Sequence, residues 1–401
     1  MGTLINRVRL RNYKSIGSCD VRLNELSVLV GLNGSGKSNF LDSFSFISDA
    51  CNSTLDTAMR NRGGLAAVRR KSSGHPTNFG MSFFMNLAEG RNAFFAFEVA
   101  ASTGERFEVR KETASISDPD PRKSFNYTVE RGEITKFPEV GVLPDIRADR
   151  LFLTSVAGLK PFDALFDALS SLSVYDINPD EFRLPQPHES GNRLKPSGQN
   201  LASTLRYVRD SSPNSYSRVC EYLRRIVRGV ESIETKSLGP TETIQFIQNV
   251  QGASAPWRFD ALNMSNGTLR SLGVLLALFH QNSDKSGRVP FVGIEEPEGT
   301  IHPGAAAILM DAIIEASHGS QIILTTHSPE LLDHKKVAEN HLLVVTSDKN
   351  ETRIGMADEA SRRAMRENLL TAGELLRANQ LSSDVESAPA LKQSELFSVT
   401  K

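Results

Sequence analysis

The sequence predicts an α/β fold, in which a mixed sheet carries a phosphate-binding loop and is joined by an antiparallel β subdomain and a helical insertion. Three observations predict it. An apolar run at 26–30 has the character of a buried strand and leads through a glycine-rich loop into a segment, 40–47, with apolar residues at helical spacing. Apolar, strand-like runs at 79–113, resumed at 124–129, predict antiparallel strands. From residue 240 onward, strand-like and helix-like segments alternate, which is typical of an α/β sheet.

The composition is that of an ordinary soluble globular protein. The chain has 401 residues, of which 39% are hydrophobic and 23% charged, enough for one large core or two modest domains. Lys and Arg number 46 against 47 Asp and Glu, a net charge of −1. The overall charge therefore neither predicts nor excludes nucleic-acid binding, and any such site must be a local patch.

Targeting and redox signals are absent from the sequence. The longest apolar run, 272–279, is too short to span a membrane, and the N-terminus lacks the order of a signal peptide. Cys19, Cys51 and Cys220 have neither metal-ligand spacing nor the number for a disulfide framework. We expect a cytoplasmic protein without a membrane partner.

Changes in composition along the chain suggest four regions. Residues 1–144 form an N-terminal lobe with the phosphate-binding loop and the antiparallel strands, and 145–235 a mainly helical insertion. Residues 236–381 form a second lobe of alternating strands and helices. The polar tail, 382–401, is expected to be disordered.

Residues 31–38, GLNGSGKS, are a complete G-x-x-x-x-G-K-[ST] motif between a strand and a helix. Such a loop turns successive backbone N–H groups toward phosphate oxygens, and the helix N-terminus adds partial positive charge. Lys37 is expected to reach the β- and γ-phosphates, and the Ser38 hydroxyl to bind Mg²⁺. The residues expected to contact ATP are Asn33, Gly34, Ser35, Gly36, Lys37, Ser38 and Asn39.

A second apolar strand, 289–294, ends in two adjacent carboxylates, Glu295 and Glu296. Beside a phosphate-binding loop, one carboxylate suits the oxygen-rich shell of Mg²⁺ and the next can orient or deprotonate the attacking water. We assign Glu295 to the metal and Glu296 to the water. The alternative is a strand that ends in a solvated acidic turn, which would be preferred if the loop were missing.

A third apolar strand, 321–326, ends in His327. Parallel α/β sheets bind ligands at the carboxyl ends of their strands, so His327 can contact the γ-phosphate or the attacking water. Ser265 and Gly267 open an apolar helix, and such a helix start can bind an anion. The alternatives are a structural histidine and a simple helix N-cap.

Taken together and in this order, these motifs resemble those of an ABC-type ATPase of the SMC/RecF/OLD group. The similarity is greatest to RecF-like bacterial ATP-binding proteins of the AAA or AbiEii-toxin type. The segments that carry it are 11–15 (RNYKS), 31–38, 265–270 (SNGTLR), 294–298 (IEEPE), 301–303 (IHP), 325–329 (TTHSP) and 373–376 (GELL).

The resemblance implies an ABC-ATPase head with ATP and Mg²⁺, and a homodimer or higher oligomer with two ATP molecules sandwiched between heads. In that arrangement Ser265 and the Gly267 amide would contact the γ-phosphate bound by the opposite subunit. Relatives complete the Mg²⁺ shell with a glutamine before the signature helix, whereas this chain has none before Gln186. The sixth ligand is therefore unassigned, with His75 and Asn78 as stand-ins.

For the biological role, the resemblance leaves two hypotheses. The long segment before Ser265 and the metal-binding glutamate disfavour a transporter cassette, and the 74 residues after His327 are too few for a nuclease domain. The first hypothesis is the ATPase subunit of an anti-phage defence or toxin system with a separate effector, such as a nuclease or toxin. The second is a RecF-like ATPase of DNA repair or chromosome maintenance that binds DNA or RNA. Its phosphate contacts would come from a basic set, for which a solvated surface is the alternative: Arg60, Arg62, Arg69, Arg70 and Lys71.

Overall fold

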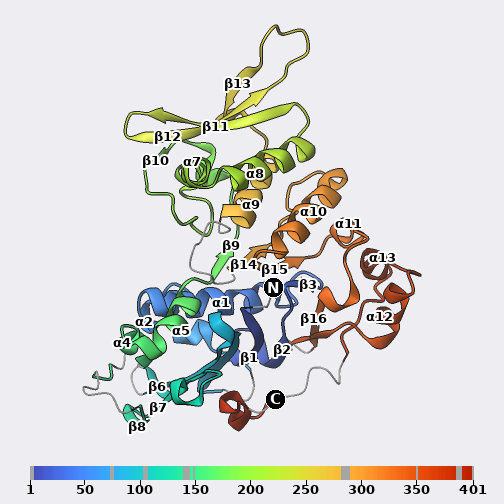
Figure 1. Ribbon diagram of the computed structural model, residues 1–401. Helices are drawn as coiled ribbons and strands as arrows, with labels where there is room; N and C mark the ends of the chain where they lie inside the picture. Colours follow the sequence, from blue (N-terminus) through green and yellow to red (C-terminus); the bar gives the residue numbers. More distant parts are fainter. Residues whose placement is uncertain are drawn as a thin grey trace.

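The computed structural model describes residues 4–72, 76–102, 107–138, 145–147, 150–280, 290–348, 351–384 and 391–399. Over these residues the strands form a 13-stranded mixed sheet and a smaller four-stranded sheet (Figure 1). The order in the large sheet is β8 (Glu133–Lys136), β7 (Phe125–Glu130), β6 (Phe107–Ser117), β5 (Asn92–Ala101), β4 (Asn78–Asn86), β1 (Ile5–Tyr13), β2 (Ile16–Arg22), β17 (Glu351–Met356), β16 (Leu342–Asp348), β3 (Leu26–Val30), β15 (Gln321–Thr326), β14 (Phe291–Glu295) and β9 (Ser173–Tyr175). The small sheet contains β10 (Gln186–Pro187), β11 (Val230–Leu238), β12 (Thr241–Gln248) and β13 (Trp257–Asp260).

The described helices pack on these two sheets. They are α1 (Lys37–Asn52), α2 (Leu55–Arg60), α3 (Leu65–Val68), α4 (Phe152–Val156), α5 (Lys160–Ser170), α6 (Asp180–Arg183), α7 (Leu201–Ser211), α8 (Pro213–Ile226), α9 (Asn266–Phe279), α10 (Ala306–Ser317), α11 (Pro329–Leu332), α12 (Glu359–Arg366) and α13 (Ala372–Arg377). Helices α7 and α8 lie between the small sheet and the pair α9 and α10, at the top of Figure 1.

The large sheet has an antiparallel half and a parallel half, as the mixed-sheet prediction requires. Strands β4 to β8 and β1 pair antiparallel, whereas β3, β15, β14 and β9 are all parallel to one another. Because parallel strands end at the same edge, the loops that follow them converge there. At that edge the phosphate-binding loop follows β3, Glu295 ends β14 with Glu296 directly after it, and His327 follows β15.

The parallel strands separate two hydrophobic cores. Leu29 and Ile323 pack with α1 and α5 in one core, while their neighbours Val28 and Ile322 pack with α9 and α10 in the other. Side chains of a strand alternate between faces, so a strand covered on both sides needs apolar residues at every position. This explains why these strands are continuously apolar in the sequence.

The segment predicted to be mainly helical contains α4 to α8 but also strands. The three residues of β9 join the large sheet beside β14, and β11 already begins at Val230. A three-residue strand between helices has too little sequence to show a period of its own, and only its pairing with β14 defines it. Among the described residues, no helix has both the length and the apolar character needed to cross a membrane.

The expectation of a disordered tail does not hold for residues 391–399. A short 3₁₀ helix, Gln393–Phe397, lies against β1, β4 and β5, and Leu396 is completely buried there. Arg9 donates hydrogen bonds of 2.7 Å to the carbonyls of Glu395 and Ser398. Gly80 leaves room for Leu396, since a Cβ there would lie 2.4 Å from its side chain. One apolar residue in a polar tail is a weak signal, and its docking depends on partners far away in sequence.

Candidate functional site

The phosphate-binding loop connects β3 to the N-terminus of α1. Gly36 is the N-cap of α1 and has a φ of 106°, a conformation that glycine adopts without strain. The Lys37 side chain is buried, and its Nζ donates to the carbonyls of Gly31 (2.8 Å) and Leu32 (3.1 Å). Asn33, Gly34 and Ser38 are exposed, so the loop offers its backbone to solvent on one side. The lysine and the free helix N-terminus lie together, as phosphate binding requires.

Strand β17 and the turn between β1 and β2 support the back of this loop. Thr352 on β17 donates a 2.8 Å hydrogen bond to the Ser35 carbonyl and contacts Ser15 at 2.7 Å. Asn39 directs its side chain to the same Ser15 hydroxyl, at 2.7 Å. A Cβ on Gly36 would lie 2.1 Å from Thr352, so this glycine is also needed for the close approach. The support from Thr352 depends on the sheet and could not be predicted from the local motif.

Glu295 ends β14 beside the loop. Its carboxylate accepts a hydrogen bond from the Ser38 hydroxyl. Burial raises the pKa of Glu295, the Ser38 hydrogen bond lowers it, and the charges of Asp176, Asp42 and Glu296 raise it. Burial lowers the pKa of Lys37, against the charges of Glu296, Glu298 and Glu295. Ser38 and Glu295, the two predicted metal-binding residues, are thus joined by a hydrogen bond. The negative charges of the three glutamates favour the charged form of Lys37.

Glu296 and His327 form a pair at the ends of two adjacent strands. The register places Glu295 opposite Thr325, so Glu296 and His327 both lie just beyond the carboxyl ends of their strands. Glu296 Oε1 lies 3.0 Å from His327 Nδ1, and the side chains are 38% and 47% exposed. Both can therefore reach a bound molecule at this edge.

Ser265 and Gly267 lie at the start of α9. Ser265 is the N-cap, accepts a 3.2 Å hydrogen bond from the Thr268 amide and is exposed. Gly267 lies against the loop after β14, where a Cβ would be 2.5 Å from the Thr300 carbonyl. Within one chain, the Ser265 contact is that of a helix N-cap, which was the alternative to an anion site. Ser265 is still accessible to a second molecule at the surface.

Asp176 is a carboxylate at this edge of the sheet that the sequence analysis did not identify. Because Ile294 pairs with Tyr175, Asp176 emerges from β9 level with Glu295. Its side chain is 74% exposed, and its charge raises the pKa of Glu295. A carboxylate directly after a strand was the sequence signal available for Asp176, but β9 was not recognised as a strand.

Of the two stand-ins for the missing glutamine, His75 lies outside the described residues and Asn78 accepts a weak hydrogen bond of 3.4 Å from Asn12.

The donor set at this edge fits Mg²⁺. The Ser38 hydroxyl and the carboxylates of Glu295 and Asp176 are all oxygen donors, which this cation prefers. The contact between Ser38 and Glu295 already brings two of them together.

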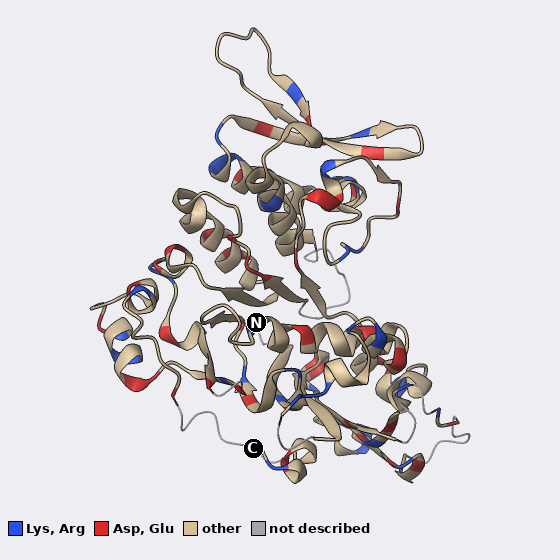
Figure 2. Ribbon diagram, turned by 180° about the vertical axis from the view of Figure 1, so that it is seen from behind, with Lys and Arg blue, Asp and Glu red and all other residues tan. Residues whose placement is uncertain are grey.

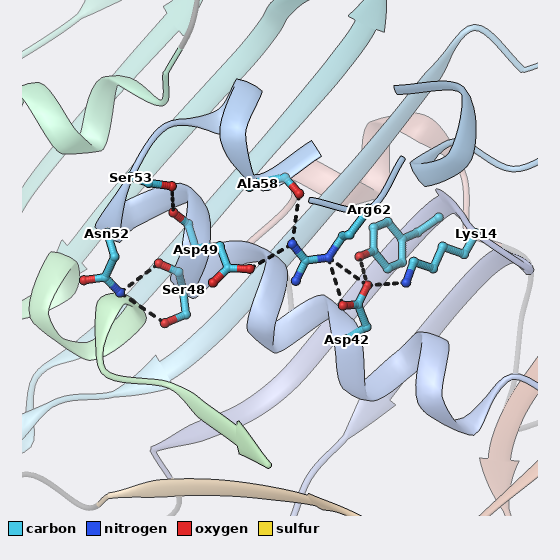
Figure 3. Close-up of polar contacts among 9 residues, drawn as sticks. Lys14, Asp42, Ser48, Asp49, Asn52, Ser53, Ala58 and Arg62 are labelled. Carbon is cyan, nitrogen blue, oxygen red and sulfur yellow. Dashed lines mark hydrogen bonds and ion pairs between the residues drawn. The ribbon is translucent and has the colours of Figure 1, made fainter. Parts of the chain in front are cut away.

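The basic residues 60–71 do not form one exposed patch. Arg62 is an internal residue whose side chain is 9% exposed and bridges Asp42 and Asp49 at 2.8 Å each, with Lys14 also on Asp42 (Figure 3). Arg70 lies 3.3 Å from Glu351 and is mostly buried. Elsewhere, Figure 2 shows Lys and Arg interspersed with Asp and Glu along the ribbon. Arg62 and Arg70, two of the five residues predicted to contact phosphate, therefore form ion pairs within the fold.

Comparison with known proteins shows the family of the chain. The family described as "AAA domain, putative AbiEii toxin, Type IV TA system" matches residues 26–333. The Old nuclease of Escherichia phage P2 is 22% identical over 364 residues, which cover 86% of this chain and 59% of that protein. The chain thus spans less than two thirds of this relative.

Solved structures show the same fold. An Smc head bound to the C-winged helix domain of ScpA has a TM-score of 0.57 at 14% identity, with 89% of this chain and 99% of that chain covered. An Smc head of Pyrococcus furiosus, with an extended coiled coil and bound to the C-terminal domain of ScpA, has a TM-score of 0.54 at 13% identity and coverage of 92% and 100%. The recognition and the fold class predicted from the motifs are therefore confirmed, and the chain belongs to the AAA, AbiEii-toxin-type family, an SMC/RecF/OLD-type ABC ATPase.

Proposed function

We propose that this protein binds ATP with Mg²⁺ and hydrolyses it to ADP and phosphate within a dimer. The observation that carries the proposal is the convergence of Lys37, the Ser38–Glu295 contact and the Glu296–His327 pair at one sheet edge. Each of these groups has a distinct use in phosphoryl transfer to water.

In the proposed reaction, the loop amides and the Lys37 ammonium hold the β- and γ-phosphates. Ser38, Glu295 and Asp176 would hold Mg²⁺, which when bound neutralises phosphate charge. Glu296 accepts a proton from the attacking water, while the oxygen of that water bonds to the γ-phosphorus and the bond from the γ-phosphorus to ADP breaks. His327 orients the Glu296 carboxylate and faces the γ-phosphate.

The dimer is proposed from the exposed start of α9. Ser265 and the Gly267 amide would complete the γ-phosphate contacts of the opposite subunit. Two large apolar side chains support an interface, since Leu32 in the loop is 68% exposed and Leu262, just before Ser265, is 57% exposed. In a head-to-head dimer each would be covered by the partner.

For the role, we propose the ATPase subunit of a cytoplasmic anti-phage defence or toxin system with a separate effector. The toxin-type family and the relative called a nuclease support this choice. DNA or RNA binding in a RecF-like repair role is the alternative, although Arg62 and Arg70 do not support its proposed patch. Purification from the native operon separates them: a copurifying effector favours defence, whereas salt-dependent DNA binding without a partner favours repair.

The direct test is the mass of Glu296→Gln by light scattering, with and without ATP and Mg²⁺. This variant keeps every proposed binding group but cannot accept the proton, so its mass should double with ATP. Glu339→Gln, at an exposed ion pair with Arg366, is the matched control and should hydrolyse ATP like the unaltered protein. An unchanged hydrolysis rate in Glu296→Gln contradicts its role, and a mass that ignores ATP contradicts the ATP-dependent dimer.

A further inference from the structure

Arg270 connects the start of α9 to the ends of β9 and β14. Its side chain is 13% exposed, makes hydrogen bonds with three main-chain carbonyls and lies 3.8 Å from the exposed carboxylate of Asp176. Nη1 donates to Ile177, and Nη2 donates to Glu295 at 3.0 Å and Glu296 at 2.9 Å. A planar guanidinium can hold several acceptors at fixed angles, which a lysine cannot do.

The residue held in this way has an unusual backbone. Glu296 has a φ of 40°, in the left-handed region that is unfavourable for a residue other than glycine. Its amide donates to the Thr325 carbonyl at 3.1 Å, and its own carbonyl accepts from Arg270. Thr325 and Arg270 therefore fix Glu296 from both sides, and its carboxylate lies beside His327.

Arg270 is not placed for stability alone. Its Nε is buried and has no hydrogen-bond partner among the described residues, which carries a desolvation cost. A Cβ on Gly299 would lie 3.1 Å from this Nε, so the loop after Glu298 packs closely on the guanidinium. The desolvation of Nε is therefore unfavourable, while Nη1 and Nη2 hold the main chain after β9 and at the end of β14.

We propose that Arg270 is a positioning residue for hydrolysis, which holds Glu296 in its left-handed conformation from the helix that carries Ser265. The inference rests on the proposed ATPase function. If a second subunit contacts Ser265 and Gly267, a shift of the first turn of α9 would move Arg270. Through Arg270, that shift would change the position of the Glu296 carboxylate. Arg270 itself contacts neither nucleotide nor water in this scheme.

The test compares Arg270→Met and Arg270→Lys with the unaltered protein. Misplacing a reacting group by about 1 Å can cost about 100-fold in rate, so kcat should fall about 10- to 100-fold in the Met variant. The dissociation constant for a non-hydrolysable ATP analogue with Mg²⁺ should stay within about twofold, because the groups that hold the phosphates are untouched and the 3.8 Å ion pair with the exposed Asp176 is weak. The Lys variant, which restores one donor, should recover part of kcat.

Arg206→Met is the matched control for fold damage. Arg206 pairs with the buried Glu242 in the upper part of the molecule, so its loss should lower the melting temperature without changing kcat. An unaltered kcat in folded Arg270→Met, or affinity lost in step with rate, overturns the inference alone. If the Met variant does not fold, the Lys variant decides by the same split. Absence of ATP hydrolysis in the unaltered protein overturns the proposed function as well.

Discussion

The carboxylate of Glu296 lies 3.0 Å from the imidazole of His327, across two parallel strands that end at the same edge of the sheet. The two residues are 31 positions apart in the chain and meet only because β14 and β15 are neighbours. A charge-assisted hydrogen bond between them fixes the direction of the carboxylate. The pairing turns two separate sequence motifs into one chemical unit.

Replacing His327 with alanine should lower kcat by about 100-fold, because Glu296 loses the partner that orients it. The Michaelis constant should change little, since the loop and Lys37 remain. Steady-state hydrolysis measures both constants. His318→Ala, at an exposed histidine, is the control, and an unchanged kcat in His327→Ala would remove this residue from the mechanism.

Replacing Lys37 with alanine should weaken ATP binding by at least about tenfold, because a charged hydrogen bond to phosphate contributes about 1.5–3 kcal/mol. Titration calorimetry with ATP and Mg²⁺ measures the effect. Lys195→Ala removes an exposed lysine paired with Glu189 and should bind ATP normally. Equal affinities for the two variants would contradict the placement of the phosphates at this loop.

Replacing Asp176 with asparagine should weaken Mg²⁺ binding in the presence of an ATP analogue by about tenfold, since a charged oxygen ligand is lost. The readout is a Mg²⁺ titration followed by calorimetry, which does not depend on turnover. Asp348→Asn, at an exposed ion pair with Arg353, serves as the comparison. Unaltered Mg²⁺ affinity in Asp176→Asn would contradict the role of Asp176 as a Mg²⁺ ligand, and the ligand that replaces the missing glutamine would stay unassigned.

His280 should make stability depend on pH. Burial lowers its pKa from 6.5 to about 4, and its Nε2 accepts a long hydrogen bond of 3.5 Å from the Leu194 amide. The unfolded chain therefore takes up a proton before the folded one, so stability present above pH 6.5 is lost as pH falls toward 4. The full difference is about 3 kcal/mol.

Urea unfolding at several pH values tests this. His280→Gln should lose less stability than the unaltered protein between pH 7 and 4, because the titrating group is gone. His318→Gln, at an exposed position, should follow the unaltered protein. Parallel pH curves for all three proteins would contradict the role of His280.

The sequence by itself determined the loop, the strand-ending carboxylates and His327, and with them the family. These signals are local: residues 31–38 carry their chemistry in contiguous positions, and Glu295, Glu296 and His327 directly follow apolar strands. Only the tertiary structure decided that β9 extends the sheet and brings Asp176 to Glu295. It also decided that Arg270 reaches Ile177, 93 positions away, that Arg62 is internal, and that Leu396 docks on Gly80. Such contacts depend on which elements pack together, and a hydrophobic period or a short motif carries no record of a partner so distant in sequence.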